Sequence, residues 1–289
     1  MSSLGWIEHR TPLRPTAGFR LKIPLVITFS SADLDAWMTS FLWPLVRILA
    51  LLAAAPVLGN TAIPMRVKIG LGVLITLILA PAIGPLPGLE AASPAGLLVL
   101  SQQVVIGLAM GFAMRIVFSA VELAGEIAGL QMGLGFATFF TPHSDGSTLV
   151  VGKFLGLLAT LVFLSLNGHL LMLSVLAESF SAFPISAEPF SAGGWRRLAE
   201  WGGTIFRAGL QLALPVVAAL LIVNLALGIL TRASPQLNVF AVGFPITLMV
   251  GMVVLMLSLP YFIPVIEHLI TEGLETMLQI AQDARPPSP

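Results

Sequence analysis

Four ionisable side chains lie inside or just beyond strongly apolar stretches of this sequence, where they could carry protons or form buried ion pairs. Arg47 lies midway along the first such stretch, while Arg115, Glu122 and Glu126 lie in and just beyond the third. Spacings of seven and four residues bring these last three close to one helical face. A charge at the bilayer centre costs roughly 2.5–3.5 kcal/mol on insertion scales, so such side chains usually face protein or water. The pattern predicts either a charged stripe that lines a conduit or a subunit contact, or a buried structural ion pair, for example with Arg47.

The other polar residues form no catalytic or metal-binding pattern. The sequence contains no cysteine, no H-E-x-x-H, no phosphate-binding loop lysine and no G-x-S-x-G serine. The four histidines are scattered along the chain at His9, His143, His169 and His268. We therefore predict that the protein is not an enzyme and binds no metal and no cofactor.

The composition indicates that a membrane surrounds most of the elements that carry these residues. Hydrophobic residues make up 57% of the 289 residues, only 10% are charged, and the mean hydropathy is +0.97. A soluble domain has about 25% charged residues, which it needs to cover its surface. The net charge is zero, so we expect no nucleic-acid partner.

Six apolar segments are each long enough to be a membrane-spanning helix, which needs about 20 mostly apolar residues. We predict an all-α, polytopic membrane protein, because each helix satisfies its own backbone hydrogen bonds in hydrocarbon. Turn-forming residues separate the segments. The predicted spans are residues 37–58, 67–89, 95–121, 150–180, 205–230 and 239–270.

We expect a single helical membrane domain, residues 26–280, with a different kind of sequence at each end. Residues 1–25 form a basic N-terminal extension rich in Arg and Pro. This extension is either native or the product of a start site upstream of the true one near Val26. The Pro-rich residues 281–289 are expected to be a disordered tail.

Glycines are unusually dense between the third and fourth segments. Gly107 and Gly111 have the spacing that lets helix backbones approach closely, and we expect them to pack against another helix. Residues 129–142, GLQMGLGFATFFTP, combine glycine with bulky Met and Phe side chains. They could form a deformable constriction, or a helix end followed by a loop, and the pattern by itself favours the helix end.

A second unusual stretch, residues 234–245 with the sequence SPQLNVFAVGFP, follows the fifth segment. Prolines at 245, 260 and 264 are expected to break the last helix. Broken helices at membrane depth are tolerated where protein or a water-filled cavity covers the freed carbonyl groups.

These two stretches resemble those of the FliR family of flagellar export-gate subunits, which is related to the injectisome export apparatus. The first span, FLWPLVRILALLAAAPVLGN with Arg47, also fits that family. The similarity extends from about residue 26 to about residue 279. The second stretch is the more specific one, and it is closer to the flagellar branch.

The resemblance implies a fold like a fusion of FliP and FliQ within a helical gate assembly, whose helices do not all cross the membrane as hydropathy suggests. It implies FliP-like and FliQ-like partners, FlhB-like and FlhA-like associated subunits, and unfolded export substrates. It places the protein in the bacterial inner membrane, in the flagellar basal body.

The resemblance also assigns roles to residues. The glycine-rich segment would project into the channel and plug it. The plug residues would be Gln131, Met132, Gly133, Leu134, Gly135, Phe136, Phe139 and Phe140. The family motif loop would contain Pro235, Gln236, Asn238, Phe240 and Pro245.

We therefore expect a non-enzymatic subunit of the flagellar type III protein export gate. The alternative is a stand-alone, proton-coupled secondary transporter in which Arg115, Glu122 and Glu126 relay protons. Transporters often contain inverted repeats, and the sequence shows none.

Overall fold

Helices account for nearly all of the described chain. A computed structural model describes residues 31–83, 93–136, 150–234, 236 and 239–285. Within these ranges there is no strand, which confirms the predicted all-α class. The helices are α1 (Ser31–Ala54), α2 (Met65–Leu79), η1 (Ala80–Ala82), α3 (Pro94–Gln131), α4 (Val150–Ser165), α5 (Gly168–Ala182), α6 (Ala192–Gly202), α7 (Thr204–Ala233) and α8 (Val239–Asp283).

The predicted end segments meet the described ranges only in part. The basic extension, residues 1–25, lies outside the described residues. The predicted boundary between the helical domain and the tail, at residues 280 and 281, falls inside α8, which continues to Asp283. Residues 286–289 lie outside the description.

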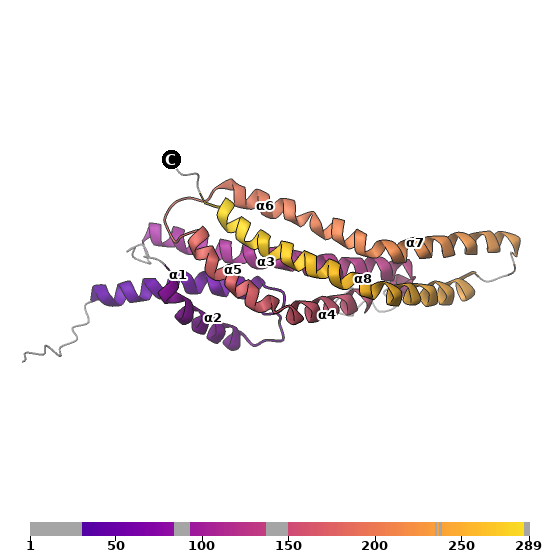
Figure 1. Cartoon of the computed structure of the whole chain (residues 1–289), viewed down its shortest axis with the longest axis horizontal. Helices are drawn as coiled ribbons and strands as arrows, with labels where there is room; N and C mark the ends of the chain where they lie inside the picture. Colours follow the sequence, from indigo (N-terminus) through magenta and orange to yellow (C-terminus); the bar gives the residue numbers. More distant parts are fainter. Residues whose placement is uncertain (1–30, 84–92, 137–149, 235, 237–238, 286–289) are drawn as a thin grey trace, which may run out of the picture.

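The long helix α3 is the centre of the bundle, and it packs against α1, α4, α6, α7 and α8 (Figure 1). Small residues allow this close approach. A Cβ atom at Gly107 would collide with the carbonyl oxygen of Arg47 in α1, and one at Gly111 would lie 2.7 Å from the Cβ of Ala54. The expected role of Gly107 and Gly111 in close helix packing is therefore confirmed.

Within the described ranges, fewer helices qualify as membrane spans than the six predicted. Four helical stretches, Met65–Ala82, Pro94–Gln131, Ala192–Ala233 and Ala241–Asp283, are long and apolar enough to cross a membrane. The bent pair α4 and α5 gives a fifth if it counts as one span. In α1 the apolar part that can be described, Ser40–Ala54, is shorter than a full span. The protein is nevertheless polytopic, as expected.

The predicted fourth span, residues 150–180, is divided by a sharp bend. Asn167 adopts a left-handed backbone conformation with φ 54°, which asparagine tolerates better than most residues. The amide of Asn167 donates to the carbonyl of Leu164, and α4 and α5 meet at 67°. Apolar composition alone cannot reveal such a bend, because both halves remain hydrophobic.

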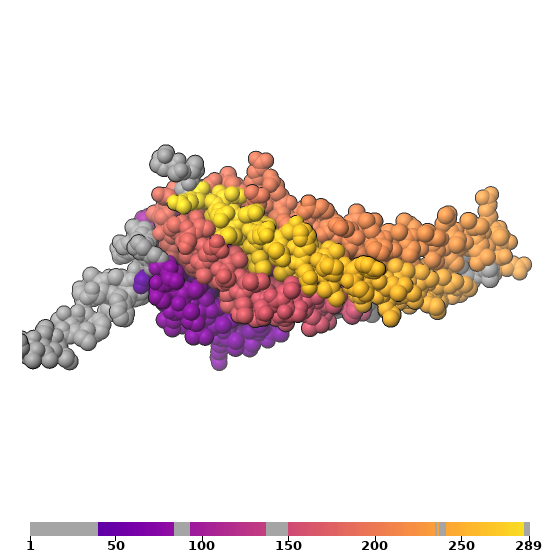
Figure 2. Space-filling model, viewed as in Figure 1, coloured from indigo at the N-terminus to yellow at the C-terminus, as the bar shows by residue number. Residues whose placement is uncertain are grey.

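The prediction that prolines break the last helix is wrong. Pro245, Pro260 and Pro264 all lie inside α8, which continues for 45 residues, and Pro215 lies inside α7. Each proline removes one backbone donor. Helix α8 packs against α3, α4, α5, α6 and α7, and it lies beside α7 on the face shown in Figure 2. These contacts support the helix across its prolines.

At one end of the molecule the end of α7 and the beginning of α8 extend beyond the other helices as a pair (Figure 1). The outward faces of α7 and of the first half of α8 are apolar. The most exposed large side chains of these two stretches are Phe206, Ile222, Leu225, Ile229, Met249, Met256, Leu257 and Tyr261.

Candidate functional site

The end of the central helix α3 is the first part of the candidate site. Its last residue is Gln131, and the amide of Met132 still donates to the carbonyl of Ala128 at 3.0 Å. Gly133 then adopts φ +88°, and its amide donates to the carbonyl of Leu130 at 3.0 Å. A left-handed residue at this position is the common way to end a helix, and glycine adopts it without strain.

Met132 is buried against α8. Its side chain is 0% exposed, and it crosses Gly251 so closely that a Cβ there would lie 2.5 Å from the Met132 Cγ. The Thr247 hydroxyl donates to the Met132 carbonyl at 3.2 Å. A Cβ at Gly133 would lie 3.1 Å from the ring of Phe244. The start of the glycine-rich segment is thus fixed on three consecutive turns of α8.

The following residues turn away from this contact. Leu134, Gly135 and Phe136 form a 3-10 turn in which the amide of Phe136 donates to the carbonyl of Gly133. Leu134 is half-buried and packs against the core, whereas Phe136 is 59% exposed. Phe139 and Phe140, the other predicted plug residues, lie outside the described residues.

The second predicted motif forms the connection between α7 and α8. Helix α7 is capped at Ser234, whose amide donates to the carbonyl of Leu230, and Gln236 is exposed. Pro235 and Asn238 lie outside the described residues, as does the side chain of Phe240, whose backbone belongs to α8. Pro245 is exposed on α8, next to the Phe244 that contacts Gly133. The structure therefore brings the end of this motif against the start of the glycine-rich segment.

Arg47 is a fully buried cation whose hydrogen-bond acceptors are neutral. Its Nε donates to Oε1 of Gln103 at 2.8 Å, and its Nη2 donates to the carbonyl of Phe183 at 2.9 Å. Its Nη1 donates to the carbonyl of Ser179 at 3.0 Å. The guanidinium also lies 4.3 Å from the centre of the Phe180 ring, a distance suited to a cation–π contact.

The hypothesis of an ion pair between Arg47 and an acid of α3 is therefore wrong. In the described part of the chain, none of the salt bridges includes Arg47. Arg115 and Glu122 are exposed on α3 and Glu126 is half-buried. A Cβ at Gly156 of α4 would lie 2.9 Å from Oε1 of Glu122. These three residues share a face of α3 as predicted, but this face is at the surface of the chain beside α4.

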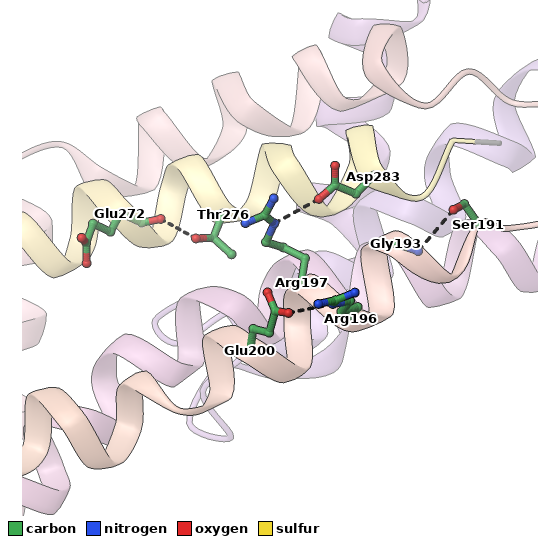
Figure 3. Close-up of polar contacts among 8 residues, drawn as sticks. All are labelled: Ser191, Gly193, Arg196, Arg197, Glu200, Glu272, Thr276 and Asp283. Carbon is green, nitrogen blue, oxygen red and sulfur yellow. Dashed lines mark hydrogen bonds and ion pairs between the residues drawn. The ribbon is translucent and has the colours of Figure 1, made fainter. Parts of the chain in front are cut away.

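A separate group of polar contacts lies where α6 packs against the end of α8 (Figure 3). Arg197 donates to Oδ2 of Asp283 at 3.0 Å, and Arg196 donates to Oε1 of Glu200 at 2.8 Å. Ser191 accepts from the amide of Gly193 and so caps α6. A polar groove lies next to these pairs, and among its lining residues are Arg207, Glu272 and Glu275. Of these contacts, the Arg197–Asp283 pair joins α6 to α8, whereas the other two stabilise α6 itself.

Sequence patterns do not identify the residues that hold these groups in place. Ser179 and Phe183 hold Arg47, and Phe244, Thr247 and Gly251 hold the end of α3. A weak signal existed for two of them, since Thr247 and Gly251 are a small pair four residues apart in an apolar helix.

Known proteins resemble this chain over nearly its whole length. The profile of "Bacterial export proteins, family 1" matches residues 38–273. A flagellar biosynthetic protein FliR from Pectobacterium carotovorum subsp. carotovorum is 51% identical over 255 residues, which cover 88% of this chain and 97% of the relative. The protein of that name from Escherichia coli (strain K12) is 42% identical over 248 residues, covering 86% and 95%. That from Bacillus subtilis (strain 168) is 31% identical over 242 residues, covering 82% and 93%. The chain therefore belongs to the bacterial export proteins of family 1 and, within them, to the FliR family.

Proposed function

We propose that this chain is a non-enzymatic subunit of the flagellar type III protein export gate, in which its glycine-rich segment closes the channel for unfolded flagellar proteins. The observation that carries the proposal is the geometry at the end of α3. There a buried Met132 anchors the chain, Gly133 turns it, and the apolar side chain of Phe136 is exposed. An apolar constriction stops ions by excluding water.

Family membership makes the chain a multi-pass component of the flagellar export apparatus in the bacterial inner membrane. The proposed partners are FliP-like and FliQ-like subunits in the gate itself, with FlhB-like and FlhA-like subunits associated with it. The large exposed apolar side chains of α7 and α8, such as Ile222 and Met256, support a protein that is covered by membrane or by other subunits.

A stand-alone proton-coupled transporter has less support. A relay requires titratable groups that face one another along a path through the membrane. The buried cation Arg47 contacts neutral acceptors, while Arg115 and Glu122 face outward from the chain.

Deleting Gly133–Phe136 tests the closing role. We expect the assembled gate to leak small ions, because the exposed apolar turn is removed while Met132 and α3 remain. The measurement is ion permeability of cells or vesicles that contain the gate, and co-purification with the FliP-like and FliQ-like subunits is the control for assembly. Unchanged permeability in a normally assembled gate would contradict the closing role.

A further inference from the structure

We infer that Thr247 and Gly251 are positioning residues that fix the end of α3, so that the turn Gly133–Phe136 moves about Gly133 and not by bending α3. We name the surface formed by Thr247 and Gly251 the Met132 seat. This inference rests on the proposed closing function and identifies the part of α8 that determines where the closing segment begins.

The Met132 seat is a close steric fit. Measured from the position of a Cβ on Gly251, the Met132 side chain has its Cγ at 2.5 Å, its Cε at 2.8 Å and its Sδ at 3.1 Å. A Cβ atom essentially never comes within 3.0 Å of a heavy atom from another part of the chain. The methionine therefore occupies the space that any larger residue at position 251 would fill.

The hydroxyl of Thr247 supplies a hydrogen bond that the helix end lacks. The last carbonyl groups of an α-helix have no partner within the helix. The carbonyl of Met132 is in this position, and it accepts from Oγ1 of Thr247 at 3.2 Å in a buried environment. The same hydroxyl also lies 3.1 Å from the carbonyl of Phe244, so it joins the end of α3 to a turn of α8.

The turn at Gly133 is the first point after α3 at which the chain changes direction. Upstream, most of α3 is buried among other helices. Gly133 has φ +88°, and the ring of Phe244 lies 3.1 Å from the position of its Cβ. A residue with a side chain would be strained and crowded at this position. The hinge and its anchor are thus adjacent residues.

The first test removes the hydroxyl while keeping the shape of the side chain. In cells with a complete export gate, Thr247→Val is expected to raise passive ion leak about fivefold, the loss expected for one buried hydrogen bond. Thr247→Ser keeps the hydroxyl, so its ion leak should be as low as that of the unchanged protein. Thr231→Val is the matched control, because the hydroxyl of Thr231 bonds only within α7, to the carbonyl of Gly228.

The outcomes separate the seat from the closing function. If a gate with the Gly133–Phe136 deletion leaks ions but a gate with Thr247→Val does not, the positioning role of the Met132 seat is wrong and the closing function stands. If the gate with the deletion does not leak ions, the proposed closing function is wrong. A leak from Thr247→Ser equal to that from Thr247→Val would also overturn the inference, because the serine keeps the hydrogen bond.

A disulfide tests the position of Met132 independently of leak and of any folding defect in the valine variant. The chain has no cysteine of its own. The contact at Gly251 places the two Cβ atoms at most about 4 Å apart, within the range of a disulfide. The variant Met132→Cys with Gly251→Cys should therefore crosslink under oxidation in the assembled gate.

Export in the crosslinked state decides where the hinge lies. We expect secretion of flagellar proteins to continue, because only residues after Met132 need to move. The variant Met132→Cys with Gly228→Cys is the control, since Gly228 has no neighbour within 4 Å. Failure to crosslink, or a block of secretion that a reductant reverses, would overturn the inference.

Discussion

At the scale of single residues, Arg47 shows how a buried charge can be stabilised without an opposite charge. Burial of an unpaired cation is costly unless its donors are satisfied. Here Gln103 of α3 and the carbonyl groups of Ser179 and Phe183 at the end of α5 supply the acceptors, and Phe180 adds a ring face. The arginine thereby connects α1 with α3 and with the end of α5.

Replacing Arg47 tests this arrangement. We expect Arg47→Leu to lower the free energy of unfolding by about 3 kcal/mol or more, because it removes the donors to the buried oxygens of Gln103 and Phe183. Arg47→Lys should cost less, since an ammonium satisfies some of them but cannot span all three directions. The measurement is the unfolding midpoint of the purified complex in detergent.

The control for this prediction is Arg196→Leu, which removes an arginine side chain that is 83% exposed. A surface substitution of this kind should change stability by less than about 0.5 kcal/mol. Equal losses for positions 47 and 196 would contradict the structural role of Arg47.

At the scale of elements, the crossing of α1 and α3 depends on the absence of side chains. Gly107 lies against the backbone of α1 at Arg47, the residue whose side chain holds the end of α5. Any displacement of α1 at this crossing would therefore also move the guanidinium. Helix packing and the polar contacts of Arg47 are coupled at one point.

Gly107→Ala is expected to destabilise the protein by about 1–3 kcal/mol, the usual effect of overpacking. The added methyl group meets backbone, which cannot rotate away as a side chain could. Gly70→Ala in α2 is the matched control, because nothing lies within 4 Å of its Cβ position. It should be neutral or slightly stabilising, since alanine favours helix. Thermal unfolding of both variants in detergent measures the difference, and a neutral Gly107→Ala would contradict the close crossing.

At the scale of the whole molecule, the chain has more apolar surface than one soluble monomer exposes. The outward faces of α7 and of the first half of α8 are apolar, and Ile222 of α7 is 69% exposed. Patches of this kind mark contacts with membrane or with other proteins. The chain therefore has the surface of a protein that is covered by membrane or by other subunits.

A charge on this surface should prevent assembly. We expect Ile222→Lys to abolish co-purification with FliP-like and FliQ-like subunits, because a lysine buried in an apolar contact costs several kcal/mol. Ala233→Lys is the control, since a cation in the last turn of the same helix is favourable. Full co-purification of Ile222→Lys would show that this face of α7 is not buried in the assembly.

Much of the architecture follows from the sequence by itself. Composition and long apolar runs require helices in a membrane, and Gly107 and Gly111 indicate where two of them cross. The glycine-rich stretch and the proline-containing connection are also visible as local patterns. These properties are local, because each depends on residues that are neighbours along the chain or on one helix.

The tertiary structure decided which distant groups meet. The acceptors of Arg47 lie 56 to 136 residues away in the sequence, and Thr247 is 115 residues from Met132. From sequence alone a carboxylate of α3 was an equally good partner for Arg47, because an acid and a set of carbonyl groups both satisfy a buried cation. The bend at Asn167 and the continuity of α8 through three prolines were likewise settled by packing. Hydrophobic patterns specify that a helix is buried, but only the assembled helices determine which polar atoms become neighbours.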